Sequence, residues 1–337
     1  MTSTRDTARC ATEKISVASS NMADLRPTSE ILRSIGNDVV GRKRERELLV
    51  AALIAGRHIL LEGPPGTGKS TLLRSMAGAM GMGFAFVEGN AELTPARLVG
   101  HFDPARVMVD GYQPSVFVDG PLVTALREGS LLYVEEINRI PEETLNVLIT
   151  VMSEGNITVP RLGVVESAPG FRLVAAMNPF DAVGTARISS AVYDRVCRIA
   201  MTYQSSEEET AIVSRHLLAA NAGEMPNEEW VGKIVEVVRR TRSHADLRFG
   251  SSIRGAIDAA LVAASLSQVR GAPITTPSIG VDSALVALTG RVRVREGSVR
   301  SAEEIVVEIW GDVFGRVEGE RDSGKAGAPT GATNSHS

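Results

Sequence analysis

The segment Gly63-Pro64-Pro65-Gly66-Thr67-Gly68-Lys69-Ser70 matches the phosphate-loop pattern G-x-x-x-x-G-K-[ST]. A short apolar strand is expected before it, over 58–62, and a helix after it, over 69–80, which is the context that the pattern requires. Glycines allow backbone N–H groups to converge on phosphate oxygens, and the N-terminus of the helix points the positive end of its dipole at the same charge. The segment therefore predicts a site for a phosphate-bearing ligand.

Two side chains at the start of this helix carry the expected chemistry. Lys69 is expected to reach the β- and γ-phosphates of a nucleotide, and the Ser70 hydroxyl is expected to ligate Mg²⁺. The next residue, Thr71, completes the candidate nucleotide-binding segment, although its position is that of an ordinary helical residue.

Two acidic residues end a second apolar strand, which is expected over 131–134. Ligands of open α/β sheets bind at the C-terminal ends of the strands, so Glu135 and Glu136 are expected to face the phosphate site. One carboxylate would hold Mg²⁺ or its water, and the other would polarise an attacking water. The alternative is a solvated acidic loop, which the phosphate loop earlier in the chain disfavours.

A third apolar strand, expected over 171–177, delivers Asn178-Pro179. An amide at the end of a strand can orient the attacking water. Asn-Pro is also a frequent opener of turns, so the residues alone leave both interpretations open.

Strand and helix patterns alternate along most of the chain, which predicts an α/β fold with a parallel sheet covered by helices on both faces. After about Met201 only helical patterns follow, so a small all-α domain is expected and no further strands. The expected organisation is a disordered tail at 1–27, an α/β domain at 28–203, a helical domain at 204–316 and a second disordered tail at 317–337.

Composition excludes several classes of protein. Apolar residues make up 43% of the 337 residues and aromatic residues only 4%, so the core is expected to consist mainly of Leu, Val, Ile and Ala. The net charge of −4 argues against a protein that coats nucleic acid. The longest apolar run, 48–55, is too short to span a membrane, and the first 20 residues lack the apolar core of a signal peptide. Two cysteines cannot build a disulfide framework, so a cytoplasmic location is expected.

With these pieces in order, the chain resembles the AAA+ ATPases over about residues 30–315, and within them the MoxR group of the helix-2-insert class, which is similar to the CbbQ/NorQ-type ATPases. Short motifs carry the resemblance, beginning with the phosphate loop. The others are Gly120-Pro121-Leu122, Glu135-Glu136-Ile137-Asn138-Arg139, Met152-Ser153-Glu154-Gly155, Ile157-Thr158-Val159, Ala176-Met177-Asn178-Pro179, Asp194-Arg195 and Gly250-Ser251-Ser252-Ile253-Arg254.

The resemblance implies a P-loop AAA+ sheet flanked by helices and followed by a small helical lid. Lys69 and Ser70 correspond to Walker A, Glu135 and Glu136 to Walker B, and Asn178 to sensor 1. The usual Walker B motif ends in Asp-Glu, so the longer side chain of Glu135 implies a shifted or weaker hold on Mg²⁺. Hydrolysis of ATP is still expected, because the position of the catalytic base is kept at Glu136.

Further roles follow from the same resemblance. Arg195 corresponds to the arginine finger that reaches the ATP of a neighbouring subunit, with Arg187 and Arg139 as competing candidates. Arg254 corresponds to sensor 2. Val40-Gly41, which follows Val39, lies where the family packs against adenine.

Two insertions characterise the class that the chain resembles. The helix-2 insert falls at about 101–118 and the pre-sensor-1 hairpin at about 156–171. The resemblance implies a homo-oligomer, expected to be a hexameric ring, that remodels or activates a client protein with a von Willebrand factor A-domain partner. Two alternatives are a nucleic-acid motor of the same insert class and a nucleotide-gated scaffold with weak hydrolysis, the latter motivated by Glu135.

Overall fold

The computed structural model describes residues 26–179, 188–220 and 226–315. Within them, the residues up to Gln204 form one compact unit and the residues from Ser205 form a second. The predicted C-terminal tail lies outside the described residues, as does the predicted N-terminal tail except for Arg26 and Pro27. Arg26 is held in place, because its guanidinium donates to the carbonyls of Gly78 and Ala79.

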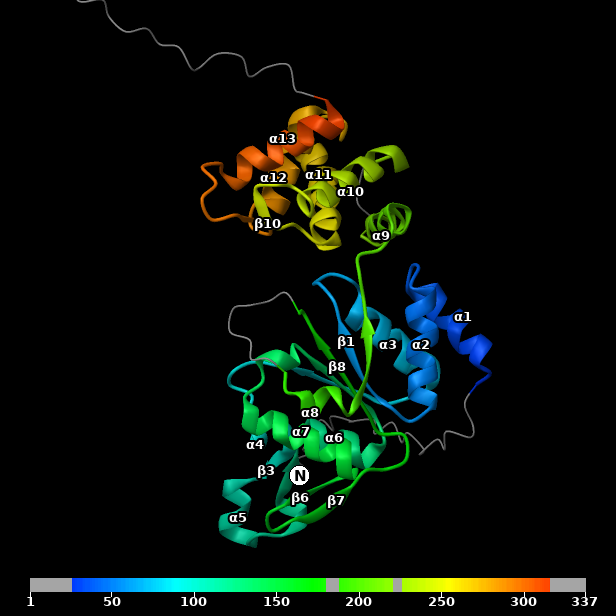
Figure 1. Cartoon of the computed structure of the whole chain (residues 1–337), viewed down its shortest axis with the longest axis vertical. Helices are drawn as coiled ribbons and strands as arrows, with labels where there is room; N and C mark the ends of the chain where they lie inside the picture. Colours follow the sequence, from blue (N-terminus) through cyan, green and yellow to red (C-terminus); the bar gives the residue numbers. More distant parts are fainter. Residues whose placement is uncertain (1–25, 180–187, 221–225, 316–337) are drawn as a thin grey trace, which may run out of the picture. The chain divides into compact units, whose positions relative to one another are not determined.

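A five-stranded sheet forms the centre of the first unit, in the order β2-β5-β8-β1-β9. Two of its strands, β1 and β8, are labelled in Figure 1. Every neighbouring pair of strands is parallel. The strands are short apolar runs, as expected for a parallel sheet that is covered on both faces. Their bounds are β1 (His58–Glu62), β2 (Phe84–Glu88), β5 (Leu131–Glu135), β8 (Arg172–Met177) and β9 (Val196–Ala200).

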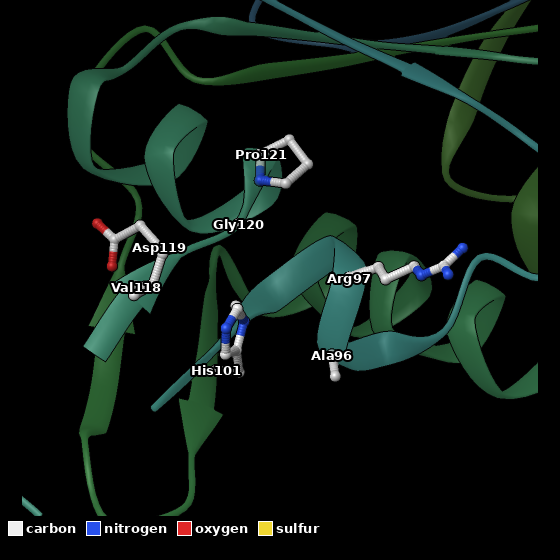
Figure 2. A pocket seen from close by; sticks show the side chains of 8 residues that line it. Ala96, Arg97, His101, Val118, Asp119, Gly120 and Pro121 are labelled. Atoms are coloured by element: carbon white, nitrogen blue, oxygen red, sulfur yellow. The ribbon is translucent and has the colours of Figure 1, made fainter. Parts of the chain in front are cut away.

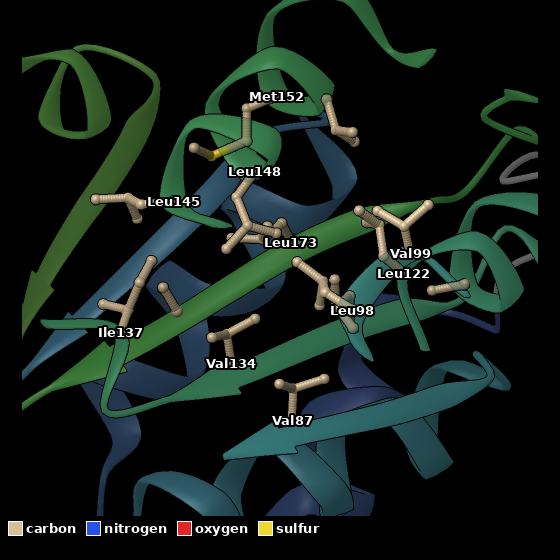
Figure 3. Close-up of a cluster of buried hydrophobic side chains, with 14 of the residues drawn as sticks. Val87, Leu98, Val99, Leu122, Val134, Ile137, Leu145, Leu148, Met152 and Leu173 are labelled. Atoms are coloured by element: carbon tan, nitrogen blue, oxygen red, sulfur yellow. The ribbon is translucent and has the colours of Figure 1, made fainter. Parts of the chain in front are cut away.

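Helices cover the two faces of the sheet. On one face, α1 (Thr28–Asp38), α2 (Lys43–Ile54) and α3 (Lys69–Met80) share a core with alternate strand residues such as Ile59 and Tyr133. On the other face, α4 (Pro95–Val99), α6 (Pro121–Glu128) and α7 (Glu142–Glu154) pack on the intervening strand residues, including Val134 and Leu173 (Figure 3). The predicted parallel α/β sheet with helices on both faces is confirmed.

Two small antiparallel hairpins project from this framework. The first pairs β3 (Gly100–Phe102) with β4 (Phe117–Asp119), and the short helices α5 (Pro104–Asp110) and η2 (Pro114–Val116) lie between the strands. The second pairs β6 (Asn156–Val159) with β7 (Gly163–Glu166). The two hairpins touch, because the guanidinium of Arg161 lies 3.6 Å from the ring centroid of Tyr112.

Short helical turns complete the first unit at the ends of two strands. The turn η3 (Ile137–Arg139) follows the acidic end of β5, and α8 (Ser190–Tyr193) precedes β9.

The second unit is built mainly of helices, which are α9 (Ser206–Ala219), α10 (Glu228–Thr241), α11 (Ile253–Arg270), α12 (Pro277–Leu288) and α13 (Ala302–Phe314). Their apolar faces enclose a separate core. The expectation that strands end near Met201 is wrong, because β10 (Leu247–Phe249) pairs with β11 (Arg293–Val294) in an antiparallel ribbon. These strands are too short to show an alternating pattern in the sequence.

None of the helices in the described residues is long and apolar enough to cross a membrane.

Candidate nucleotide-binding site

The phosphate loop joins the C-terminal end of β1 to the N-terminus of α3. Gly68 takes a left-handed conformation (φ +80°) at the N-cap of α3, where a side chain would be strained. At the other end of the loop, a Cβ on Gly63 would lie 2.3 Å from the carbonyl oxygen of Met201. Glycine is therefore required at both positions.

Lys69 is buried and folds back over the loop. Its Nζ donates to the carbonyl oxygens of Gly63 and Pro64, both at 2.9 Å. An ammonium group held at this position is ready to turn from the two carbonyls to phosphate oxygens, which are stronger acceptors because they are charged.

Ser70 faces the acidic end of β5. Its Oγ lies 3.1 Å from Oε1 and 3.2 Å from Oε2 of Glu135, and 3.2 Å from the hydroxyl of Tyr133. A hydroxyl beside a carboxylate supplies the oxygen ligands that Mg²⁺ prefers, so the residues present fit this ion. The parallel pairing of β1 with β8 and of β8 with β5 places the C-terminal ends of β1 and β5 at the same edge of the sheet, which brings these two groups together.

Tyr133 belongs to this group and was not predicted from the sequence. Burial, together with the nearby charge of Glu135, raises the pKa of Tyr133 above its usual value. Its hydroxyl therefore stays neutral beside Glu135. Sequence reasoning could not place Tyr133, because β5 is an apolar run buried on both faces of the sheet. Such a run has no alternation of apolar and polar residues that would indicate which face each side chain occupies.

Glu136 has a left-handed backbone (φ +52°), which is unusual for a residue with a side chain. Its Oε2 lies 3.1 Å from Nε of Arg139, and both side chains are more than one-third exposed. Behind it, the N–H of Gly89 donates to the Glu135 carbonyl at 2.8 Å, and a Cβ on Gly89 would collide with the Glu136 carbonyl. The end of β5 is thus clamped against the end of β2, which sets the direction of the Glu136 side chain.

The remaining predicted residues belong to different parts of the chain. Asn178 directly follows Met177, whose carbonyl accepts the Gly63 N–H at 3.2 Å, so Asn178 begins beside the loop. Arg254 is the second residue of α11, in the second unit. Arg187 lies outside the described residues.

Arg195 follows α8, and its side chain contacts residues of the same chain. Its Nη1 donates to the carbonyl of Ala191 at 2.8 Å and its Nε donates to the hydroxyl of Ser153. The carboxylate of Asp194 lies 3.8 Å from Nη1. The competing candidate Arg139 is paired with Glu136 of the same chain, as described above.

Arg42 is a buried cation beneath the loop that sequence reasoning missed. Its Nη2 donates to the carbonyls of Thr67 (3.0 Å) and Thr202 (2.7 Å), and its Nη1 pairs with Glu45 at 2.9 Å. Arg42 stands in a mixed run of charges, Arg42 to Glu47, which gives no sign that one member is buried. The residue ties the phosphate loop to the segment that follows β9.

The predicted adenine-packing segment lies next to Arg42. Gln204 Nε2 donates to the carbonyl of Val40 at 2.7 Å, so the segment that follows β9 also holds Val40-Gly41 in place.

A separate pocket lies beside the first hairpin (Figure 2). It has a volume of about 380 Å³ and is lined by Ala96, Arg97, Gly100, His101, Val118, Asp119, Gly120 and Pro121.

Among the described residues, no cluster of three or more His, Cys, Asp or Glu side chains is arranged to hold a metal ion. The phosphate loop, with Ser70 and Glu135, is thus the part of the described chain best suited to a nucleotide and its cation.

Comparison with known proteins agrees with this geometry. Residues 58–196 match the AAA domain of the dynein-related subfamily. The uncharacterised protein YeaC of Bacillus subtilis is 29% identical over 257 residues, which cover 69% of this chain and 77% of that protein. An uncharacterised protein of Staphylococcus epidermidis is 36% identical over 149 residues, which cover 44% of this chain and 56% of that protein. This chain thus spans just over half the length of the staphylococcal relative.

Among solved structures, a variant of RuvB from Thermotoga maritima is similar, with a TM-score of 0.52 and 20% identity over 78% of this chain and 73% of that chain. This likeness concerns the fold alone. Residues 58–196, which include the phosphate loop, thus match an AAA domain in sequence and in fold, and a mainly helical region follows.

Proposed function

We propose that this protein is an ATP-hydrolysing AAA+ remodelling chaperone of the MoxR type. The observation that carries the proposal is the approach of Ser70 to Glu135 beside Lys69, with Glu136 next along the chain. These are the groups that hydrolysis needs, because phosphoryl transfer depends on positioning and on stabilising charge.

Each residue of the site has a separate task in this proposal. Lys69 leaves the carbonyls of Gly63 and Pro64 and binds the β- and γ-phosphates. Ser70 and Glu135 hold Mg²⁺, which neutralises charge on the phosphates when it is bound. Glu136 accepts a proton from the attacking water, and Asn178 orients that water.

Two arginines, Arg195 and Arg254, complete the proposed site in addition to the residues named above. We assign Arg195 to the ATP of a neighbouring subunit, which requires a ring, proposed to be hexameric. To reach that ATP, Arg195 must leave Ala191 and Ser153, the partners it has in the single chain. Arg254 of the second unit is assigned to the γ-phosphate of its own subunit. The helical unit would then report hydrolysis as a change in its angle to the sheet.

The two hairpins are the proposed contact with a client. Met108 and Val109 of α5 are 87% and 84% exposed, and Tyr112 is half exposed. Apolar side chains gathered at one exposed place indicate an interaction site. The pocket at His101 and Asp119 lies at the base of the same hairpin. A von Willebrand factor A-domain protein is the proposed adaptor that selects the client.

The test is phosphate release from the purified protein, measured with Mg²⁺ over a range of protein concentrations. We expect specific activity to rise with concentration as subunits associate, and Glu136→Gln and Arg195→Ala to abolish it. Arg270→Ala is the matched control, because Arg270 forms an exposed ion pair with Asp282 in the second unit. Binding of ATP without release of phosphate, or an active Arg195→Ala variant, would contradict the proposal.

Two other outcomes identify the alternatives. Stimulation by DNA would favour a nucleic-acid motor, although the one cation at the tip of the second hairpin, Arg161, is already stacked on Tyr112. Tight ATP binding with no turnover under any condition would favour a nucleotide-gated scaffold.

A further inference from the structure

A buried carboxylate lies directly beside the phosphate loop and has no task in the chemistry above. Glu62 is the last residue of β1, immediately before Gly63, and is only 5% exposed. Its Oε1 accepts a hydrogen bond of 2.7 Å from the hydroxyl of Tyr193, and its Oε2 pairs with Arg198. A buried carboxylate is stable only with such partners, so Tyr193 is firmly attached to the end of β1.

Tyr193 is also the last residue of α8 and lies two residues before Arg195. The N–H of Arg195 donates to the carbonyl of Val192 at 3.0 Å, and its guanidinium donates to Ala191 of the same turn. The arginine is therefore built on a single helical turn, and the end of that turn is anchored to Glu62. A movement of Glu62 displaces the base from which Arg195 extends.

The other end of this connection is Lys69. Its ammonium group donates to the Gly63 carbonyl at 2.9 Å, and that donor is withdrawn when Lys69 turns to a phosphate. Gly63 is confined, because its N–H donates to Met177 and its Cα packs against the Met201 carbonyl. The carbonyl that Lys69 releases and the carboxylate that holds Tyr193 therefore belong to adjacent residues, Gly63 and Glu62.

We propose that the hydrogen bond from Tyr193 to Glu62 couples nucleotide binding at a subunit's own phosphate loop to the placement of the Arg195 that it supplies to its neighbour. The inference rests on the proposed function, because it requires Arg195 to act on the next subunit's ATP. Tyr193 is a positioning residue, since its hydroxyl donates to Glu62 and it acts on the arginine through that contact. Burial raises the pKa of Tyr193 to about 12, so its hydroxyl remains a donor throughout the working pH range.

The test compares Tyr193→Phe with the unaltered protein. This change removes one hydroxyl, keeps the ring, and leaves Arg198 paired with Glu62. We expect the unaltered protein to show a Hill coefficient above 1 for phosphate release against ATP concentration. In Tyr193→Phe we expect the Hill coefficient to fall to about 1 and kcat to fall about tenfold. A tenfold change is within the range by which single mutations alter the coupling between two sites. The affinity for a fluorescent ATP analogue stays unchanged.

Two further variants separate coupling from a structural role. Thr150→Val removes a hydroxyl that donates to Asn146 on the exposed side of α7, and its Hill coefficient is expected to equal that of the unaltered protein. Glu62→Gln keeps an acceptor oxygen for Tyr193 and is expected to retain a coefficient above 1.

The outcomes distinguish this inference from the proposed function. A Tyr193→Phe variant that remains as cooperative as the unaltered protein overturns the coupling, as does an unaltered protein without cooperativity. If these results occur while Arg195→Ala is inactive, the shared site stands and only the coupling is wrong. If Arg195→Ala is fully active, the shared site fails and the coupling fails with it.

Discussion

The Ser70 hydroxyl lies 3.1 Å from Oε1 of Glu135, although the two residues are 65 positions apart in the chain. Glutamate at this position is one methylene longer than the aspartate that usually ends this strand in the ATPases the chain resembles. The structure shows that this longer side chain still reaches the phosphate loop, and that it meets Ser70 with both carboxylate oxygens. The distance therefore supports Glu135 as a ligand.

Glu135→Gln is predicted to weaken the hold on Mg²⁺ while nucleotide still binds. Loss of the negative charge beside Ser70 removes a ligand that Mg²⁺ prefers to a neutral amide. The Mg²⁺ concentration for half-maximal phosphate release should rise about tenfold, which corresponds to about 1.4 kcal/mol. The measurement is a titration of activity with Mg²⁺ at saturating ATP. Glu128→Gln, at a carboxylate that accepts from Ser130 away from the loop, should leave the titration unchanged.

Arg42→Gln is predicted to destabilise the first unit and to weaken ATP binding. The change leaves the buried carbonyl of Thr67 and the part-buried carbonyl of Thr202 without their donor, which costs about 1–3 kcal/mol of the free energy of unfolding. Because Thr67 belongs to the phosphate loop, the KM for ATP should rise more than kcat falls. Thermal unfolding and steady-state kinetics measure the two effects. Arg44→Gln, at an exposed position of α2, is the control; an equal effect of both changes would contradict the prediction.

His58 is predicted to make stability depend on pH below neutrality. Burial and the nearby charges of Arg172 and Arg57 lower its pKa to about 4. Its Nδ1 accepts the Leu173 N–H at 3.0 Å, which requires the neutral ring. In the unfolded chain the pKa is about 6.5. Between these values the unfolded chain binds more protons, so the free energy of unfolding falls as the pH falls from about 6.5 to about 4.

His58 alone can change the free energy of unfolding by at most about 1.4 kcal/mol per pH unit. Unfolding by urea at several pH values measures it, and His58→Gln should reduce the slope in this window. His216→Gln, at an exposed residue of α9, should not. An unchanged slope in His58→Gln would show that other groups cause the pH dependence.

Glu209→Gln is predicted to destabilise the second unit strongly. The Glu209 side chain is 2% exposed and pairs with Arg239 at 2.9 Å and with Arg242 at 2.8 Å. Removing one charge of a buried ion pair leaves the others uncompensated, which costs about 3–5 kcal/mol. The exposed pair of Glu236 and Arg240 is the control, and Glu236→Gln should cost no more than about 1 kcal/mol. Chemical unfolding followed by Trp230 and Trp310 fluorescence reports on this unit, since both tryptophans belong to its core.

Several features could be predicted from the sequence because their causes are local. The phosphate loop depends on glycines and on its position between a strand and a helix, and both are visible in consecutive residues. The acids at 135 and 136 follow an apolar run whose end defines the edge of the sheet. The parallel sheet follows from the alternation of strand and helix patterns. In each case the signal lies within one element and its neighbours.

Other features depend on which strand lies at an edge and on contacts between distant segments. Cys197 stands in a short apolar run and is nevertheless exposed, because β9 is the last strand of the sheet and presents side chains to solvent. The ribbon of β10 and β11 was not expected, because its two short strands become stable only when the surrounding helices bring them together.

The chemistry expected of the phosphate site could be inferred from the residues alone, because the required residue types occur in fixed order within single strands, turns and helix starts. The side chains that hold this site in place became visible only in the folded chain. Arg42 meets Thr202 across 160 positions, and Tyr193 meets Glu62 across 131. Such pairs have no pattern in the sequence, because a buried guanidinium or hydroxyl is selected by the shape and polarity of the place where distant segments pack.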